Sequence, residues 1–449
     1  MKVHSIIILF LFLQLLLCDE LGGIKVVLND EFINSTLANF EDKIKVFLEG
    51  VKLEDQKPLT NMVFGVKNFT LDKINLSFGE DGLINVKVKN LEPFLIGQIS
   101  IKIISAIVKK FTIRLTNFSL EGKVRVKSKQ LSNGGYTPDA EFVSDPKLYF
   151  NIKFEIGGSL GSIVEKALNS AVDIIQTIIL KVVSMEFNDL LAIIMKSLPT
   201  EAKIGLYWMD FTLSSPIQLK NKFLEINSYG LLYSKDYPET SKKDRYTLAK
   251  LPSSTNNKFQ LLVSEYSINS AAYTYLTANK LNNILKYNII TSFVNVMLPD
   301  ISKKYGSKNA ELSFNPKPES NVKLTEDYLY LELPGTFYVK IDGVDVFICE
   351  LYLKLKAQAT IEIGPKMSAK IMDITGNIGD ILLNDATTAS KDKIDSGFIL
   401  IRNALKPIMN EYIKQYANLS FPSIMGISFT NVEIHHKDGY LLVNLDISK

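Results

Sequence analysis

The chain has 449 residues, of which 46% are apolar, and its formal net charge is +3. This is enough apolar material for two domains that each bury their own core, so disulfide bonds are not needed for stability at this length. Because basic and acidic residues nearly balance, any concentration of positive charge is a local patch and not a basic domain.

The N-terminus carries the pattern of a secretory signal. Lys2 precedes an apolar stretch at residues 6–17, which has the length of a secretory signal and is too short to span a membrane. We therefore expect residues 1–18 to be removed and the protein to be secreted to the extracellular space or to the lumen of the secretory pathway. Cys349 is then the one cysteine left, so no internal disulfide is possible, and we expect its thiol to be buried in a strand.

Five N-x-S/T sequons fit passage through a glycosylating secretory route. They begin at Asn34, Asn68, Asn75, Asn117 and Asn418. Each triplet by itself carries little weight, since such triplets arise by chance in an asparagine-rich chain.

The order of elements is repeated along the chain. In each half an amphipathic helix precedes a run of alternating strands, and a long apolar helix then leads into a last strand. In the first half these elements are expected at residues 31–48, 62–156 and 162–198; in the second half they are expected at residues 269–285, 310–383, 397–417 and 427–447. The predicted domains are 19–215 and 259–449, joined by residues 216–258, which hold central-sheet strands and an exposed connector loop at 235–258.

Alternating apolar and polar residues dominate residues 62–156, as at 83–89 and 123–127. Period two with glycine-containing turns predicts a meandering antiparallel sheet with one solvated face. Helices do not alternate with these strands, which disfavours the α/β enzyme architectures.

The helix expected at residues 162–198 has an unusually wide apolar face. Its main stripe includes Ile163, Ala167, Ala171, Ile174, Ile178 and Val182. Such a face packs against more than one surface, or against a sheet and something that is not protein, although the pattern alone favours a core helix. Charged residues such as Asp173 and Lys181 interrupt it too often for a membrane span.

Residues 157–161 form a G-x-S-x-G sequence with Ser159 in the position of a hydrolase nucleophile. The mature chain offers His435 and His436 as the base, but an antiparallel meander does not supply the sheet that gives this motif its geometry. We therefore interpret the glycines as a turn, with a serine hydrolase as the alternative of another class. Adjacent histidines on a strand point to opposite faces, so no metal site is predicted.

Eight basic residues and one acid, Glu121, occur from residue 102 to residue 129. The candidate ligands for anionic headgroups are Lys109, Lys110, Arg114, Lys123, Arg125, Lys127 and Lys129. A solvated sheet face explains such residues without any ligand. The functional interpretation is contact with anionic lipid. Nucleic acid is disfavoured, because secretion removes that partner and no aromatic stacking residues are interleaved.

Several segments in a fixed order carry a family resemblance. They are LLVSEYSINSA at residues 261–271, LPDISKKY at 298–305, Phe421-Pro422 with the strand region 427–447, and Leu160-Gly161 and Leu198-Pro199 at the two ends of the first long helix. Together they resemble the family of bactericidal/permeability-increasing protein and lipopolysaccharide-binding protein, which also includes plasma lipid transfer proteins. The resemblance covers nearly all of the mature chain.

The resemblance implies an α+β fold of two similar elongated barrels of antiparallel strands, each packed with long helices and joined by a central sheet into a boomerang. Each barrel would hold acyl chains in an apolar groove, which makes the stripe of the first long helix, with Leu276 and Leu281 in the second copy, pocket lining. Family members bind lipopolysaccharide through a basic tip, which corresponds to residues 109–129. The family's disulfide in the first barrel cannot form here, because no cysteine lies between Asp19 and Ile348.

We therefore predict a secreted, non-enzymatic lipid-binding or lipid-transfer protein whose partner is phospholipid or another acyl lipid. The alternative within the family is a lipopolysaccharide-binding antibacterial protein of innate immunity that acts at an anionic membrane surface. No catalytic residue, cofactor, metal or nucleic-acid partner is predicted.

Overall fold

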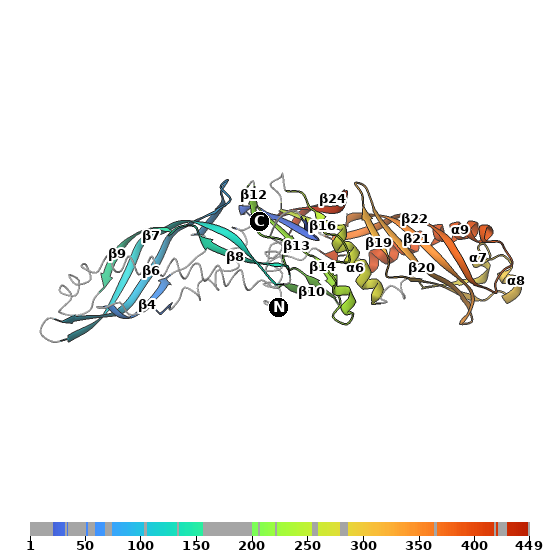
Figure 1. The fold of residues 1–449 in the computed structure, drawn as a ribbon, viewed down its shortest axis with the longest axis horizontal. Helices are drawn as coiled ribbons and strands as arrows, with labels where there is room; N and C mark the ends of the chain where they lie inside the picture. The colour runs from blue at the N-terminus through green and yellow to red at the C-terminus, as the bar shows by residue number, and fades with distance from the viewer. Residues whose placement is uncertain are drawn as a thin grey trace.

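The computed structural model describes residues 21–31, 34, 51–52, 59–67, 74–102, 106–132, 134–155, 200–204, 207–220, 222–253, 259–278, 286–362, 366–416, 419–420 and 429–447. In these residues the protein is mostly antiparallel sheet with few helices. The molecule is elongated, with a large twisted sheet at each end and a smaller sheet between them (Figure 1). Pairings among the described strands do not join the two edges of either large sheet, so neither closes on itself there.

Seven strands form the N-terminal sheet. Their order is β3 (Val51–Lys52), β4 (Leu59–Lys67), β6 (Ile84–Lys102), β7 (Ala106–Gln130) and β8 (Tyr136–Phe142), with β5 (Ile74–Phe78) paired to β6 and β9 (Lys147–Glu155) paired to β7. All these pairs are antiparallel. The meander predicted from period-two alternation is therefore confirmed where this region is described.

A bulge in β7 keeps its basic residues on one face. Asn117 has a φ of 54°, in the left-handed region that asparagine tolerates better than most residues, and the register with β9 shifts there. In a regular strand, residues an odd number apart point to opposite faces. Arg114 and Lys123 are nevertheless both exposed. Leu115 and Leu120 are both buried, so the bulge restores the same orientation on its two sides.

Strands from both halves of the chain form the central sheet. Their order is β12 (Gln218–Lys220), β13 (Phe223–Ser228), β2 (Ile24–Leu28), β16 (Phe259–Ser264), β25 (Tyr440–Ile447) and β24 (Phe429–Lys437). Smaller sheets are formed by β10 (Glu201–Ile204), β11 (Tyr207–Asp210) and β14 (Leu231–Tyr233), and by β1 (Leu21–Gly22) with β15 (Ala249–Lys250). All five residues of β2 are buried, and this strand joins β13 of the first half to β16 of the second.

A buried ion pair lies across β2 and β13. Lys25 Nζ is 2.8 Å from Glu225 Oε2, and the two side chains are 1% and 5% exposed. Lys25 also donates to Leu251 O at 3.3 Å, and Ser253 Oγ donates to Glu225 at 3.1 Å. These bonds compensate charges that are otherwise costly to bury. The prediction of an exposed loop at 235–258 is therefore wrong in part, because Leu251, with 1% exposure, covers the central sheet.

The C-terminal sheet also has seven strands. Their order is β17 (Lys286–Ile290), β18 (Asn309–Pro316), β20 (Leu329–Ile341), β21 (Val344–Glu362), β22 (Lys366–Asn384) and β23 (Leu419–Ser420), with β19 (Asn321–Leu324) paired to β20. The described helices are α6 (Glu265–Thr277), α7 (Thr291–Val294), α8 (Ile301–Tyr305) and α9 (Lys391–Tyr416), with a 3-10 turn η3 (Pro238–Ser241).

Several predicted boundaries differ from the structure. Helix α6 begins at residue 265, because Ser264 has the extended conformation of an N-cap, and β17 already starts at 286. Helix α9 begins at 391, where Ser390 O accepts the first helical N–H groups. The strand expected at 427–447 is a hairpin, because Gly439, with a φ of 81°, makes a tight turn between β24 and β25. The helices predicted at 31–48 and 162–198 lie outside the described residues, apart from Glu31 and Asn34.

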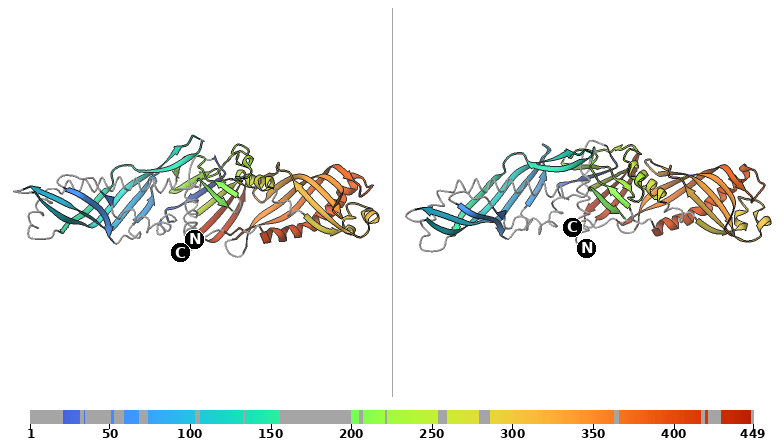
Figure 2. Two further views of the ribbon diagram at one scale, coloured as in Figure 1. Left: turned by 90° about the horizontal axis from the view of Figure 1, so that it is seen from below. Right: turned by 60° about the horizontal axis from the view of Figure 1, so that its bottom comes forward.

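Helix α9 lies along the edge of β22 beyond the two residues that pair with β23 (Figures 1 and 2). Four of its polar side chains bond to the backbone of this strand. They are Asn410 with the N–H and C=O of Ile371, Asp395 with the N–H of Ile378, Arg402 with the C=O of Gly376 and Lys406 with the C=O of Met372. Their helical spacing places them on one stripe, which satisfies edge groups that a neighbouring strand would otherwise pair.

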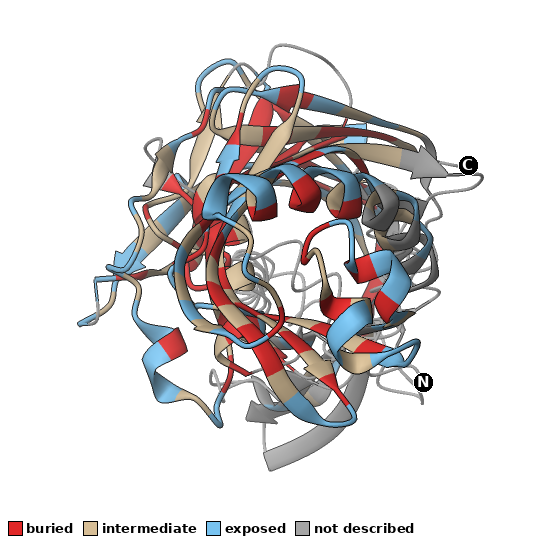
Figure 3. Ribbon diagram, turned by 90° about the vertical axis from the view of Figure 1, so that its right-hand side faces the viewer, coloured by how far each residue is buried: buried red, intermediate tan, exposed pale blue. Residues whose placement is uncertain are grey.

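The apolar side of α9 packs into the C-terminal core, and Figure 3 shows buried residues along one side of this helix and exposed residues along the other. The rings of Phe398 and Phe337 meet edge to face, with centroids 6.0 Å apart. Cys349 in the same core is a free cysteine with 0% exposure. Burial raises the pKa of its thiol to about 12, so the expectation of a buried, unpaired thiol is confirmed.

His436 connects the central sheet to the C-terminal sheet. Its Nε2 accepts a hydrogen bond from Ala359 N–H at 3.0 Å, which requires an unprotonated nitrogen. Burial of the ring, which is 8% exposed, lowers the pKa of His436 below its usual value. The contact between β24 and β21 therefore favours the neutral imidazole.

Asn410→Ala should destabilise the C-terminal unit. It leaves both backbone groups of Ile371, a residue with 1% exposure, without their partner, so the free energy of unfolding should fall by about 1–3 kcal/mol in urea denaturation. Asn403→Ala, on the exposed side of the same helix, is the matched control and should change it by less than about 0.5 kcal/mol. Equal effects of the two variants would contradict a structural role for the edge bonds.

His436→Gln should make stability less sensitive to acid. The pKa of His436 is lower in the folded than in the unfolded chain, so the unfolded chain binds a proton first as pH falls. The stabilising contribution is complete above the unfolded pKa of about 6.5 and is lost as pH falls towards the folded value. Urea midpoints at pH 7.5 and 5.0 should differ less in this variant than in the wild type. His435→Gln, which alters an exposed ring, should leave the difference unchanged.

Candidate functional site

The inner face of the N-terminal sheet is lined by apolar side chains. They come from alternating positions of β5 to β9 and are buried or half-buried. They are Phe78, Val86, Val88, Ile113, Leu115, Phe118, Leu120, Val124, Ala140, Leu148 and Phe150. Among the residues described between 51 and 155, none of the buried side chains is charged. The face can therefore accept an apolar ligand without leaving a charge unpaired.

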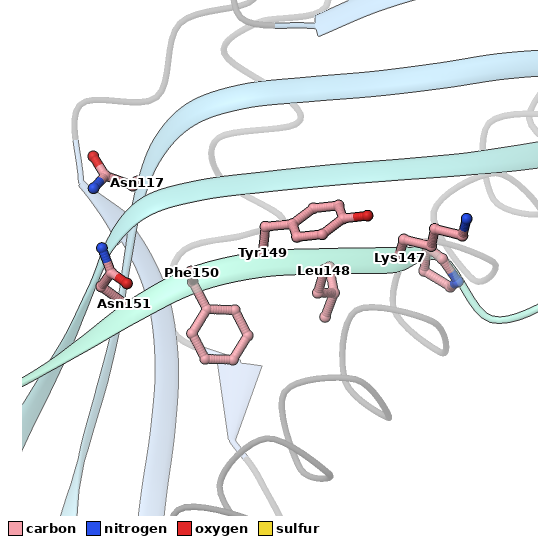
Figure 4. Close-up of a pocket in the computed structure, with 7 residues that line it drawn as sticks. Asn117, Lys147, Leu148, Tyr149, Phe150 and Asn151 are labelled. Atoms are coloured by element: carbon pink, nitrogen blue, oxygen red, sulfur yellow. The ribbon is translucent and has the colours of Figure 1, made fainter.

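A pocket of about 690 Å³ opens at β9, lined by Asn117 and residues 146–151 (Figure 4). Leu148 and Phe150 point to one side of the strand and Tyr149 points to the other. The first two are half-buried, and the ring of Phe150 stacks on Phe118 with centroids 6.2 Å apart. Tyr149 is 56% exposed. The pocket is thus lined by side chains from both faces of β9.

Most residues predicted to line the pocket lie outside the described part of the chain. These are Ile163, Ala167, Ala171, Ile174, Ile178, Val182 and Leu281, and Ser159 of the G-x-S-x-G sequence lies there too. Leu276 is described on α6, where it is 3% exposed and packs in the C-terminal core. The stripe of the first long helix therefore stays a prediction as pocket lining, and the inward positions of the strands are further candidates.

The predicted headgroup residues that the structure describes with side chains all face solvent. These are Arg114, Lys123, Arg125, Lys127 and Lys129. The side chains of Lys109 and Lys110 lie outside the described part. The structure therefore brings the basic residues of the second half of β7 onto one outer face.

Acidic residues from neighbouring elements lie among these basic ones. Lys123 Nζ is 2.5 Å from Asp81 Oδ2, and Lys127 forms an ion pair with Glu141. The hydrogen bond from Lys123 lowers the pKa of Asp81. Asp81 precedes β6 and Glu141 lies on β8, so a count of charges along β7 did not include them. This part of the face is mixed in charge.

Arg125 and Lys129 differ from the two paired lysines. No ion pair involves either of them within the residues that the structure describes. They are also exposed. If the outer face binds an anionic headgroup, these two residues are available cations on β7.

The sequons differ in their surroundings. The Asn34 amide donates to the carbonyls of Asp30 and Leu76 at 2.8 and 2.7 Å and accepts Leu76 N–H at 2.9 Å. A glycan would replace one of its two donor hydrogens. The exposed sequon residues are Asn75 and Asn117, and those outside the described part are Asn68 and Asn418. Among the described sequon residues, Asn75 and Asn117 are thus exposed, whereas the Asn34 side chain is bonded to the backbone.

The two histidines lie on opposite faces of β24, one exposed and one buried. Within the described residues, no group of three or more His, Cys, Asp or Glu side chains could hold a metal ion. No helix in this part of the chain is long and apolar enough to cross a membrane.

Comparison with known proteins identifies a relative among the curated proteins. Bactericidal permeability-increasing protein of Rattus norvegicus is 22% identical over 331 residues, which are 67% of this chain and 65% of that protein. The match thus spans slightly less than two thirds of the relative's length. The resemblance to the bactericidal/permeability-increasing protein family is thereby confirmed. No protein-family model matches the chain.

Solved structures give more distant matches. A crystal structure of lipopolysaccharide binding protein has a TM-score of 0.48 and 12% identity, covering 95% of this chain and 99% of that one. The crystal structure of P47 of Clostridium botulinum E1 has a TM-score of 0.28 and 11% identity, covering 96% and 100%.

Arg125→Gln with Lys129→Gln should weaken binding to vesicles that contain phosphatidylglycerol. Each cation near an anionic surface contributes about 1 kcal/mol, so the loss should be about tenfold or more at low ionic strength in a sedimentation assay. Lys323→Gln with Lys370→Gln makes the same change in net charge on the C-terminal sheet, where both residues are exposed, and serves as the control. Equal affinities of the two double variants would contradict a headgroup role for the face.

Proposed function

We propose that this chain is a secreted, non-enzymatic lipid-binding protein that holds acyl chains against the inner face of its N-terminal sheet. The observation that supports this most is the apolar lining of that face from Phe78 to Phe150, without a charged side chain among its described buried residues. The similarity to bactericidal permeability-increasing protein supports the same class of ligand.

The mechanism is the removal of acyl chains from water. Each buried methylene contributes roughly 0.8 kcal/mol, so about ten methylenes would contribute roughly 8 kcal/mol before the entropic costs of binding. An apolar wall selects for chain length and saturation more than for the headgroup. The headgroup would remain at the pocket beside β9, where Lys147 and Asn151 are exposed.

We place the principal cargo site in the N-terminal unit. In the C-terminal unit, Phe337, Phe347 and Phe398 are at most 4% exposed and fill the core together with α7, α8 and α9. The second pocket predicted from the repeated element order stays a prediction, since Leu281 lies outside the described residues. The covered edge of β22 still supports the barrel-like enclosure that the family resemblance implies.

A second candidate function is the binding of lipopolysaccharide or another anionic lipid at the outer face of β7. Arg125 and Lys129 favour it, since they are exposed cations outside the ion pairs of that face.

Transfer of lipid between membranes would follow if the pocket beside β9 is the entrance to the inner face.

Native purification should recover acyl lipid with the protein. Extraction and mass spectrometry should find phospholipid or fatty acid in near-stoichiometric amount, and Leu148→Trp, which fills space on the inner side of β9, should lower that amount. Lipid-free protein from a native source would contradict the proposal.

Thr116→Trp provides the matched control for this experiment. It places an equally large ring on the outer face of β7, where Thr116 is exposed, and should leave the lipid content at the wild-type level. A similar loss of lipid in both variants would indicate general disturbance of the sheet and would remove the support for the inner face as the site.

A further inference from the structure

The far end of the C-terminal unit carries exposed apolar side chains, which we call the apolar pole. These side chains come from β17, from α7 and the two residues that follow it, from the start of β21, from β22 and from α9. They are Ile290, Phe293, Val296, Val344, Leu382 and Leu400, with exposures between 40% and 64%. These are half of the large hydrophobic side chains that are exposed among the described residues. Figure 3 looks onto this end of the molecule.

Backbone and ion-pair contacts bring the strand ends of the pole together. β17 ends at Ile290 beside the start of β18, and Lys308, just before β18, reaches Asp342 in the β20–β21 turn at 2.5 Å. Asp385 N–H donates to Val346 O at 2.9 Å, which places the end of β22 beside the same turn.

Helices α7 and α9 meet at the same end. A Cβ atom on Gly397 of α9 would lie 2.2 Å from Val296 O, so the two backbones are in direct contact. Leu400 lies one turn further along α9. Thr291 Oγ1 donates to Gly306 O at 2.7 Å, which anchors α7 to the chain after α8. The pole is thus a preformed surface and not a loose loop.

The α7 region is apolar on two sides. Val294 and Met297 are 0% exposed and pack in the core. Phe293 and Val296 are 40% and 45% exposed. A hollow of about 480 Å³ lies beside Phe293, lined also by residues 289, 290 and 292. Core packing explains why Val294 and Met297 are apolar, but it does not explain why Phe293 and Val296 are. Exposed apolar patches of this kind mark interaction sites.

The charges around the pole are balanced. Lys303 pairs with Asp300 at 2.7 Å and Lys340 with Asp345 at 3.5 Å, in addition to the pair at Lys308. Such a surface gains little from an anionic membrane, because attraction to anionic lipid requires clustered unpaired cations.

We propose that the apolar pole docks the protein onto a neutral, zwitterionic phospholipid surface, with Phe293, Val296 and Leu400 inserted at the headgroup boundary. Phenylalanine and leucine at exposed helix positions are typical of such shallow insertion. This goes beyond the proposed cargo site, because the pole lies on the opposite unit and docking does not require a bound lipid. The two ends of the molecule would then differ in role, with cargo at one and membrane contact at the other.

The test is binding to phosphatidylcholine vesicles by flotation. Phe293→Ser, Val296→Ser and Leu400→Ser combined should weaken binding at least about tenfold, since three apolar groups no longer leave water. The matched control combines Ile96→Ser, Val143→Ser and Tyr352→Ser, which have exposures of 44%, 41% and 46% outside the pole, and should bind as the wild type does. Equal binding by the two triple variants overturns the proposal.

A second measurement follows the pole directly. Phe293→Trp in a Trp208→Phe background should show blue-shifted emission with phosphatidylcholine vesicles and quenching by brominated lipid, whereas unchanged emission overturns the proposal. Light scattering tests whether a second copy of the chain occupies the pole. If the wild type is a dimer that dissociates in the triple variant of the pole while vesicle binding is unchanged, the pole belongs to a second copy and membrane docking is overturned. The amount of bound lipid measured by mass spectrometry does not depend on vesicle binding or on tryptophan emission. A wrong assignment of the cargo site can therefore be distinguished from a wrong assignment of the pole.

Discussion

Hydrogen bonds between polar side chains of α9 and the backbone edge of β22 determine the arrangement of the C-terminal unit. An edge strand presents N–H and C=O groups that must be paired or solvated. The polar stripe of α9 that ends at Asn410 forms hydrogen bonds with these groups. These bonds fix the orientation of the whole helix. Phe398 then points into the core and Leu400 points outward, so the packed interior and the apolar pole are two results of one constraint.

The central sheet has a comparable constraint in β2. Five residues near the start of the described chain are hydrogen-bonded to strands from both halves. The ion pair between Lys25 and Glu225 is almost completely buried, and a buried pair contributes little net stability while separation of its partners is costly. We infer that it acts mainly on register, because a shifted β2 would leave one charge alone in an apolar layer that includes Leu251.

The two large sheets share an antiparallel design and bury apolar side chains to a similar degree in their described residues. The described core of the C-terminal unit is filled by its own side chains from α7, α8 and α9. The N-terminal inner face is apolar throughout its described buried residues, and a pocket lies beside β9. The proposed roles, with cargo in one unit and membrane contact at the end of the other, therefore depend on the pocket beside β9 and on the apolar pole, and not on a difference in burial.

The sequence by itself determined the antiparallel sheets, the burial of Cys349 and the resemblance to a lipid-binding family, because alternation and local segments depend on neighbouring residues. Only the tertiary structure decided which charges meet. Asp81 and Glu141 neutralise lysines of β7 from other strands and turns, and the apolar pole joins Phe293 to Leu400, more than a hundred positions away. Such surfaces are set by strand neighbours and by how a helix is rotated against a sheet edge, and these long-range pairings leave no periodic signal in the chain.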